Sequence, residues 1–143
     1  MKKIILICLV GITLIACNQS GKKQSDTKET PNAETTKTDN STVNVYYFHG
    51  KQRCKTCIAV GNVAKETVEK NYADNDKVRF TEINTSEKAN EALAEKYEIS
   101  WNALIIAKGE NSIDITDQAF ATAVSNPQSL ENLIKEEVNK RIN

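Results

Sequence analysis

Cys54-Lys55-Thr56-Cys57 is the stretch on which the interpretation of this chain depends. It follows the apolar run Val43-Asn44-Val45-Tyr46-Tyr47-Phe48 and precedes a segment with helical periodicity. Two cysteines at this spacing, at a junction between a strand and a helix, can close a disulfide, bind a soft metal or exchange thiols. The junction matters because the first N–H groups and the dipole of a helix stabilise a thiolate.

The N-terminal residues predict a secretory signal. Lys2 and Lys3 form a basic start, and the apolar run of about a dozen residues that follows is too short to span a membrane as a stable helix. The run ends in Leu14-Ile15-Ala16-Cys17, which resembles the lipobox of bacterial lipoproteins. The resemblance implies that residues 1–16 are a signal peptide and that a lipid on Cys17 anchors the protein to a membrane. The alternative is an ordinary cleaved signal with a chance cysteine.

This interpretation places the protein in the cell envelope, facing outside the cytoplasm, in the periplasm or at the cell surface. Of the 4 cysteines, Cys8 would leave with the signal and Cys17 would become a thioether. Only Cys54 and Cys57 would then remain as thiols. Exported compartments allow a disulfide between them to persist.

The charge of the chain argues against nucleic-acid binding. The sequence has 19 basic and 19 acidic residues, and loss of the two lysines of the signal leaves a formal charge of −2. No stripe of basic residues could follow a nucleic-acid backbone. We therefore expect no nucleic-acid partner.

Residues 17–42 are expected to be the lipidated cysteine and a disordered tether. Nearly all of these residues are polar, so the segment cannot bury enough apolar area to offset the entropy lost on ordering. As a flexible coil it would have a mean reach of about 25–30 Å. Such a tether would keep the domain of residues 43–143 near partners in the membrane.

Residues 43–143 are predicted to form one α/β domain. Hydrophobic periodicity and turn residues predict strands over 43–49, 78–83, 103–107 and 112–116, and helices over 57–72, 86–97 and from 126 to the C-terminal end. A short helical turn is expected within 117–125. Ser86 is the expected N-cap of the second helix, and Asn126 followed by Pro127 is expected to start the last one.

These elements predict the order βαβαββα. Connections through helices are expected to make the first strands parallel, and a tight turn at Gly109 is expected to make the last two strands an antiparallel hairpin. The result would be a mixed four-stranded sheet flanked by helices on both faces. The second helix is expected to bury four residues, Ala89, Ala92, Leu93 and Tyr97.

This order, with Cys-x-x-Cys at the end of the first strand, resembles the thioredoxin fold. A second segment also resembles the family, because Glu95-Lys96-Tyr97-Glu98-Ile99-Ser100 leads into the strand Ala103-Leu104-Ile105-Ile106. The resemblance implies a thiol-disulfide oxidoreductase that needs no cofactor or metal and acts on protein thiol or disulfide substrates. In such an enzyme Cys54 would attack and Cys57 would resolve the mixed disulfide.

Three features depart from the family pattern. Thioredoxins usually carry a cis-proline before the third strand, where this chain has Ser100-Trp101-Asn102-Ala103. A cis bond without proline costs about 2.5–4 kcal/mol, so we expect a trans bond and an altered groove formed by Trp101 and Asn102. Arg53 replaces the usual tryptophan, and the loop through His49-Gly50-Lys51-Gln52 is longer than usual. The sequence also offers no candidate for the family's buried acid.

Basic residues surround the first cysteine in the sequence. Lys51, Arg53 and Lys55 are expected to favour the thiolate form of Cys54 through their positive charge. His49 is expected either to shape the loop or to adjust the cysteines and pass a proton.

Other uses of the cysteine pair stay open on the sequence alone. A permanent structural disulfide would close a loop of only four residues and would gain little entropy. Two thiolates, with or without His49, would suit a thiophilic metal or metalloid such as monovalent copper or a trivalent arsenical. The domain could also be a redox-inert interaction module. The sequence does not fix the direction of electron flow, although a reductant would need a transmembrane thiol electron donor.

Overall fold

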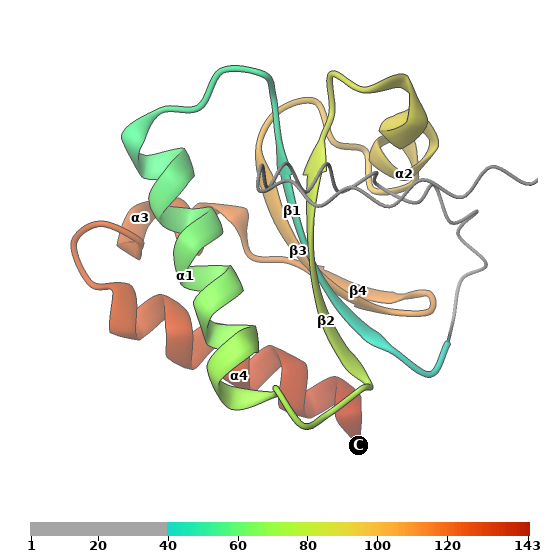
Figure 1. The fold of residues 1–143 in the computed structure, drawn as a ribbon, viewed down its shortest axis with the longest axis vertical. Helices are drawn as coiled ribbons and strands as arrows, with labels where there is room; N and C mark the ends of the chain where they lie inside the picture. The colour runs from blue at the N-terminus through green and yellow to red at the C-terminus, as the bar shows by residue number, and fades with distance from the viewer. Residues whose placement is uncertain (1–39) are drawn as a thin grey trace, which may run out of the picture. The chain divides into compact units, whose positions relative to one another are not determined.

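The computed structural model describes residues 40–143, so the predicted signal peptide, Cys17 and most of the predicted tether lie outside the described residues. Residues 40–143 form a mixed four-stranded sheet with four α-helices and one short 3-10 helix (Figure 1). The strands are β1 (Val43–His49), β2 (Val78–Asn84), β3 (Ala103–Lys108) and β4 (Asn111–Asp114). The helices are α1 (Lys55–Asn71), η1 (Lys88–Asn90), α2 (Glu91–Lys96), α3 (Thr116–Thr122) and α4 (Pro127–Ile142). The predicted α/β class and mixed four-stranded sheet are confirmed.

The strand order in the sheet is β2-β1-β3-β4. β1 and β2 are parallel, and β3 and β4 form the predicted antiparallel hairpin, with Gly109 in the left-handed region at φ 59°. The expectation of parallel first strands is wrong for β3, which runs antiparallel to β1. β2 ends with Asn84 beside His49, and β3 begins with Ala103 beside Phe48, so the connection through η1 and α2 starts and ends at the same end of the sheet. The chain therefore enters β3 in the direction opposite to β1.

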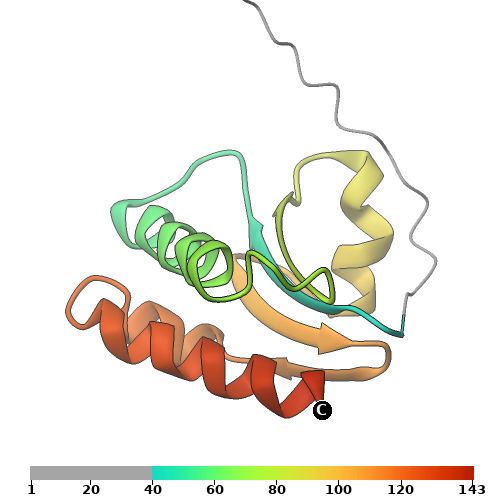
Figure 2. The same ribbon diagram turned by 60° about the horizontal axis from the view of Figure 1, so that its bottom comes forward.

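Helices cover both faces of the sheet. Figure 2 shows α1 and α4 together on one side and α2 on the other. Alternation along β1 sends Tyr47 into the core under α1, α3 and α4 and sends Tyr46 into the core under α2. Within residues 40–143, no helix combines the length and apolar character needed to cross a bilayer.

Two helix starts are close to those predicted. α1 begins at Lys55, two residues earlier than expected, because Cys54 is its N-cap. The expected stripe of Val60, Ala64 and Val68 is buried. α4 begins at Pro127, and the side chain of Asn126 accepts a hydrogen bond from the Ser129 N–H at 3.2 Å. The start of α4 is thus the one that the capping and proline rules place.

The predicted start of the second helix is wrong. Ser86 does not cap it, since its hydroxyl accepts a hydrogen bond from the Lys51 N–H at 3.2 Å and the chain first forms η1. α2 therefore begins at Glu91. The later start changes the buried face, so that Ala94 is buried while Ala89 and Ala92 are exposed.

The C-terminal half contains one more helix than the predicted order βαβαββα. The fourth strand ends at Asp114, because the Asp114 carboxylate accepts a hydrogen bond from the Thr116 N–H at 2.8 Å and turns the chain into α3. Ile113 and Ile115 nevertheless pack in the same core, as their shared face predicted. The expected helical turn within 117–125 is the full helix α3.

Candidate functional site

The centre of the site is a disulfide between Cys54 and Cys57 at the start of α1. The Cα atoms of the two cysteines are 5.1 Å apart. Cys54 is exposed, whereas Cys57 is only 4% exposed and faces the interior. A molecule in solution therefore meets the sulfur of Cys54 first.

Hydrogen bonds fix both cysteines to the helix and the sheet. The sulfur of Cys54 accepts a hydrogen bond from the Cys57 N–H at 3.2 Å, which places it among the free N–H groups at the positive end of α1. The hydroxyl of Tyr47 donates a buried hydrogen bond to the Cys57 carbonyl at 2.6 Å. The first turn of α1 is thereby tied to the central strand β1.

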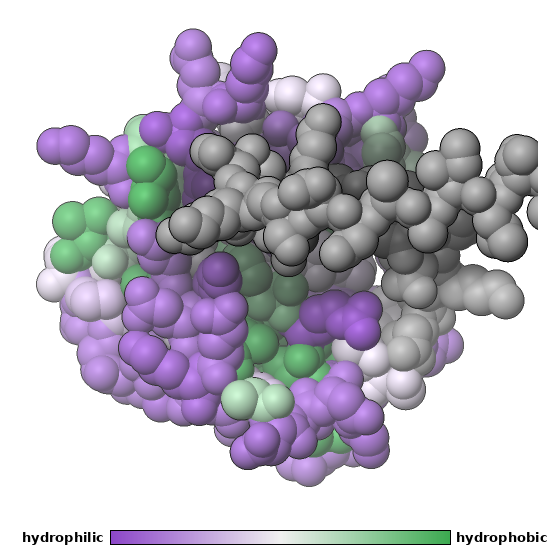
Figure 3. Space-filling model, viewed as in Figure 1, coloured by the Kyte–Doolittle hydropathy of each residue, from purple (hydrophilic) through white to green (hydrophobic). Residues whose placement is uncertain are grey.

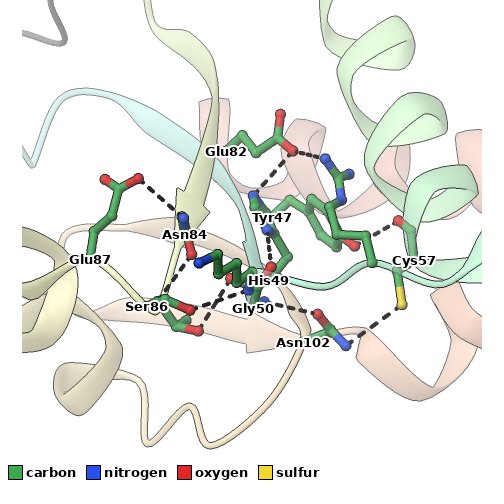
Figure 4. Close-up of polar contacts among 12 residues, drawn as sticks. Tyr47, His49, Gly50, Cys57, Glu82, Asn84, Ser86, Glu87 and Asn102 are labelled. Carbon is green, nitrogen blue, oxygen red and sulfur yellow. Dashed lines mark hydrogen bonds and ion pairs between the residues drawn. The ribbon is translucent and has the colours of Figure 1, made fainter.

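Tyr47 also packs against an ion pair that involves Glu82 (Figure 4). The Arg53 guanidinium lies 5.3 Å from the centre of the Tyr47 ring and forms an ion pair with Glu82. Burial raises the pKa of the Tyr47 phenol above its ordinary value, an effect that the Arg53 charge opposes in part. Tyr47 therefore stays a neutral hydrogen-bond donor at physiological pH.

His49 belongs to the same cluster. Its Nδ1 lies 2.8 Å from the Gly50 carbonyl oxygen, and its Nε2 lies 3.2 Å from a carboxylate oxygen of Glu82. Glu82 thus contacts both His49 and Arg53 and offsets the positive charge of Arg53. Of the four residues expected to tune Cys54, Lys51 and Lys55 are exposed beside the pair, whereas Arg53 and His49 face Glu82.

The segment before β3 lies against the buried cysteine. The peptide bond between Trp101 and Asn102 is trans, since residues 40–143 contain no cis peptide. The Asn102 amide nitrogen is 3.7 Å from the sulfur of Cys57, and the Asn102 amide oxygen accepts a hydrogen bond from the Gly50 N–H at 3.4 Å. Asn102 therefore connects the loop after β1 to the disulfide.

A shallow groove extends from Asn102 along α3. Its volume is about 380 Å³, and it is lined by Trp101, Asn102, Thr116, Asp117 and Phe120. Trp101 is 81% exposed, so it forms a wall of the groove and adds little to the core. The structure thus brings both predicted groove residues to one depression beside the cysteines.

Two further apolar side chains are exposed, one on α1 and one after α3. Ile58, in the first turn of α1, is 44% exposed, and Val124, in the connection from α3 to α4, is 64% exposed. Figure 3 shows hydrophobic surface over this end of the molecule, on a face that is otherwise mostly hydrophilic. The surface near the disulfide can therefore contact apolar groups of another molecule.

Sequence reasoning missed Glu82 and the hydrogen bond of Tyr47. Glu82 could be found only from the parallel register of β1 and β2, which pairs Tyr47 with Glu82. A Cβ at Gly61 would lie 2.8 Å from both the Arg53 guanidinium and the Tyr47 ring, so the glycine permits this close packing. Within residues 40–143, no group of three or more His, Cys, Asp or Glu residues could hold a metal ion.

No family model matches this chain. No curated protein matches it either. Among solved structures, the chain is similar to one described as the structure of a malarial protein, with a TM-score of 0.47 and 24% identity over 68% of this chain and 98% of that chain. A likeness at this level does not show a shared function, so the chemistry of the site is inferred from its own residues.

Proposed function

We propose that this protein is a thioredoxin-like thiol-disulfide oxidoreductase that acts through Cys54 and Cys57. One observation carries the proposal, namely a disulfide at the N-terminus of a helix with one exposed and one buried cysteine. This arrangement suits a reaction in which the first sulfur meets the substrate and the second completes the exchange.

The exchange has two steps when the protein starts as a dithiol. The Cys54 thiolate attacks one sulfur of a substrate disulfide, which forms a mixed disulfide and releases the other substrate sulfur as a thiolate that takes a proton from water. The Cys57 thiolate then attacks the sulfur of Cys54, which forms the Cys54–Cys57 disulfide and releases the second substrate thiolate. The substrate gains two electrons and the protein loses two. Oxidation of a substrate dithiol is the same sequence in reverse.

The surroundings of Cys54 support its role as the attacking thiolate. The Cys57 N–H already points at its sulfur, and the dipole of α1 favours negative charge there. The exposed Lys51 and Lys55 add positive charge, whereas the charge of Arg53 is offset by Glu82. A thiolate stabilised in this way is present at neutral pH and leaves readily in the reverse step.

The groove supports a protein as the substrate. Trp101 and Phe120 offer apolar contacts next to the disulfide, and a groove of this kind can accept an extended segment that carries a cysteine. Protein thiols or disulfides are therefore the proposed substrates.

We also propose that the domain works on a tether outside the cytoplasm. The lipobox-like segment ending at Cys17 supports residues 1–16 as a signal peptide and residues 17–42 as a lipidated tether for the domain of residues 43–143. A lipid on Cys17 would hold the domain at a membrane of the cell envelope. A reductant in that position would be returned to the dithiol by a transmembrane thiol electron donor.

The proposal is tested by following reduction of a disulfide-containing peptide with dithiothreitol as electron source. Cys54→Ser should abolish turnover. Reduced Cys57→Ser, mixed with a peptide of two disulfide-linked halves after the dithiothreitol is removed, should accumulate a mixed disulfide whose mass is that of the protein plus one half of the peptide. Thr56→Ser, between the two cysteines, is the matched control and should retain turnover. A wild-type protein without turnover, as expected of a redox-inert interaction module, would contradict the proposal, as would full activity of Cys54→Ser.

A further inference from the structure

The two sulfurs of the pair have different hydrogen-bond donors. Cys54 is exposed and faces the backbone N–H of Cys57 at the helix start. The buried sulfur of Cys57 instead lies 3.7 Å from the side-chain amide of Asn102, a residue 45 positions away. The environment of the second sulfur is therefore set by a residue outside the Cys-x-x-Cys segment.

The contacts of the Asn102 side chain fix which end of its amide faces the sulfur of Cys57. Its oxygen accepts from the Gly50 N–H at 3.4 Å, so its NH₂ group is the end directed at the sulfur of Cys57. Gly50 lies in the loop between β1 and α1, and Asn102 immediately precedes β3. One amide thus joins the loop, the third strand and the buried sulfur.

We propose that Asn102 is a positioning residue whose amide donates a hydrogen bond to the Cys57 thiolate and stabilises it during thiol exchange. The inference rests on the proposed function and names a residue that controls the second step. Burial disfavours a charged sulfur at Cys57, and a hydrogen bond to the charged form opposes that effect. A donor held in place by the Gly50 N–H supplies this bond without reorganisation.

The same contact acts in both directions of the exchange. When Cys57 attacks the mixed disulfide, the amide raises the fraction of Cys57 present as thiolate. When an incoming thiolate attacks Cys54 of the disulfide, the S–S bond breaks and Cys57 leaves as a thiolate facing the same donor. Stabilising that leaving group accelerates its departure.

The test is an alkylation titration of Cys57 with iodoacetamide in a Cys54→Ser background. Serine is a good N-cap, so the start of α1 should persist. Asn102→Leu removes the amide at similar volume and should lower the alkylation rate at neutral pH about tenfold, the effect of losing one hydrogen bond to a charged group, and should move the midpoint of the pH profile upward. Asn102→Ala is the second variant if the leucine disturbs folding.

Ser100→Ala is the matched control, because it changes an exposed residue of the same segment and leaves both the Gly50 N–H and the Asn102 amide in place. It should leave the titration of Cys57 near that of the background protein. The charged groups around the site, Lys51, Arg53, Lys55, Glu82 and Asp117, are unchanged in every variant, so their effects cancel in the comparison.

An unchanged titration in both Asn102 variants, or an equal shift in Ser100→Ala, would overturn the inference. The Cys54→Ser background cannot turn over, so the titration is independent of the peptide reduction assay. An inactive wild type with a shifted titration would contradict the proposed function alone. An active wild type with an unshifted titration would contradict the role of Asn102 alone.

Discussion

The two faces of the sheet bury very different amounts of apolar surface. The core under α1, α3 and α4 contains fifteen buried residues, whereas the core under α2 contains seven. The larger core includes Tyr47, which holds the first turn of α1 and therefore Cys57. The disulfide is therefore attached to the face of the sheet that buries more apolar side chains. The less packed α2 face can accommodate backbone strain.

Matched truncations in the two cores test this difference most strongly. Ile134 is 0% exposed in the larger core, and Ile83 is 2% exposed in the smaller one. Ile134→Ala should lower the free energy of unfolding by about 4 kcal/mol, and Ile83→Ala by about 2 kcal/mol, because a core covered by one short helix collapses more easily around a cavity. Urea denaturation measures both losses. Equal losses of unfolding free energy in the two variants would contradict the difference in packing between the two faces.

The close approach at Gly61 links the larger core to the site. In Gly61→Ala the new methyl group would press on the Tyr47 ring and the Arg53 guanidinium at 2.8 Å. Overpacking destabilises a protein by about 1–3 kcal/mol, and the better helix propensity of alanine stabilises it by up to about 1 kcal/mol. We therefore expect the free energy of unfolding to fall by about 1 kcal/mol. Thermal unfolding measures it. Gly50→Ala is the control, since nothing lies within 4 Å of a Cβ there, and it should change the stability little.

The end of α2 shows strain on the opposite face. Glu98 adopts a φ of 56°, and the Ile99 N–H donates a hydrogen bond to the Ala94 carbonyl at 2.8 Å at the end of the helix. Glycine is the usual residue at such a left-handed position. Glu98→Gly should raise the free energy of unfolding by about 0.5–1 kcal/mol.

Glu95→Gly is the control for that substitution. It places the same residue inside α2, where it should cost about 1 kcal/mol. Chemical denaturation of the two variants should therefore give shifts of opposite sign. Destabilisation by Glu98→Gly would show that the helix end carries no strain.

One buried carboxylate, that of Glu137, makes the stability of the protein depend on pH. Hydrogen bonds from Lys140 at 2.7 Å and Arg141 at 2.8 Å lower the pKa of Glu137, against an opposing effect of burial. Because the folded-state pKa lies below the ordinary value of 4.5, this stabilisation is present above pH 4.5 and is lost as the pH falls through the folded-state value. Glu137→Gln should therefore be less stable than the wild type at pH 7, with a difference that shrinks below pH 4.5. A difference that stays constant over this range in thermal unfolding would argue against the pairing.

Much of the fold follows from local sequence signals. The bounds of β1 and the start of α4 at Asn126-Pro127 were predictable, because alternation and capping depend on neighbouring residues. The start of α2 was not, since the Ser86 hydroxyl is used by the Lys51 N–H of another loop. The direction of β3 also escaped local reasoning, as it depends on which end of the sheet the connection from β2 reaches.

The cysteine pair of the site was predictable from the sequence, but the residues that position and contact it were not. The Cys-x-x-Cys spacing and the helix start identify the pair, and the absence of proline before β3 predicts the trans bond at Asn102. The contacts of Glu82 with Arg53 and His49 depend on the register between β1 and β2, which a reading of single segments does not supply. The Asn102 contact with Cys57 joins residues 45 positions apart and required the folded structure.

The reduction potential of the Cys54–Cys57 pair tests the central claim most directly. Equilibration with glutathione, read out by mass spectrometry, gives its value. An exchange-active pair should fall between about −270 mV, near thioredoxin and typical of a reductant, and about −120 mV, typical of a strong oxidant. A value far below about −300 mV would identify a structural disulfide and contradict the proposed oxidoreductase.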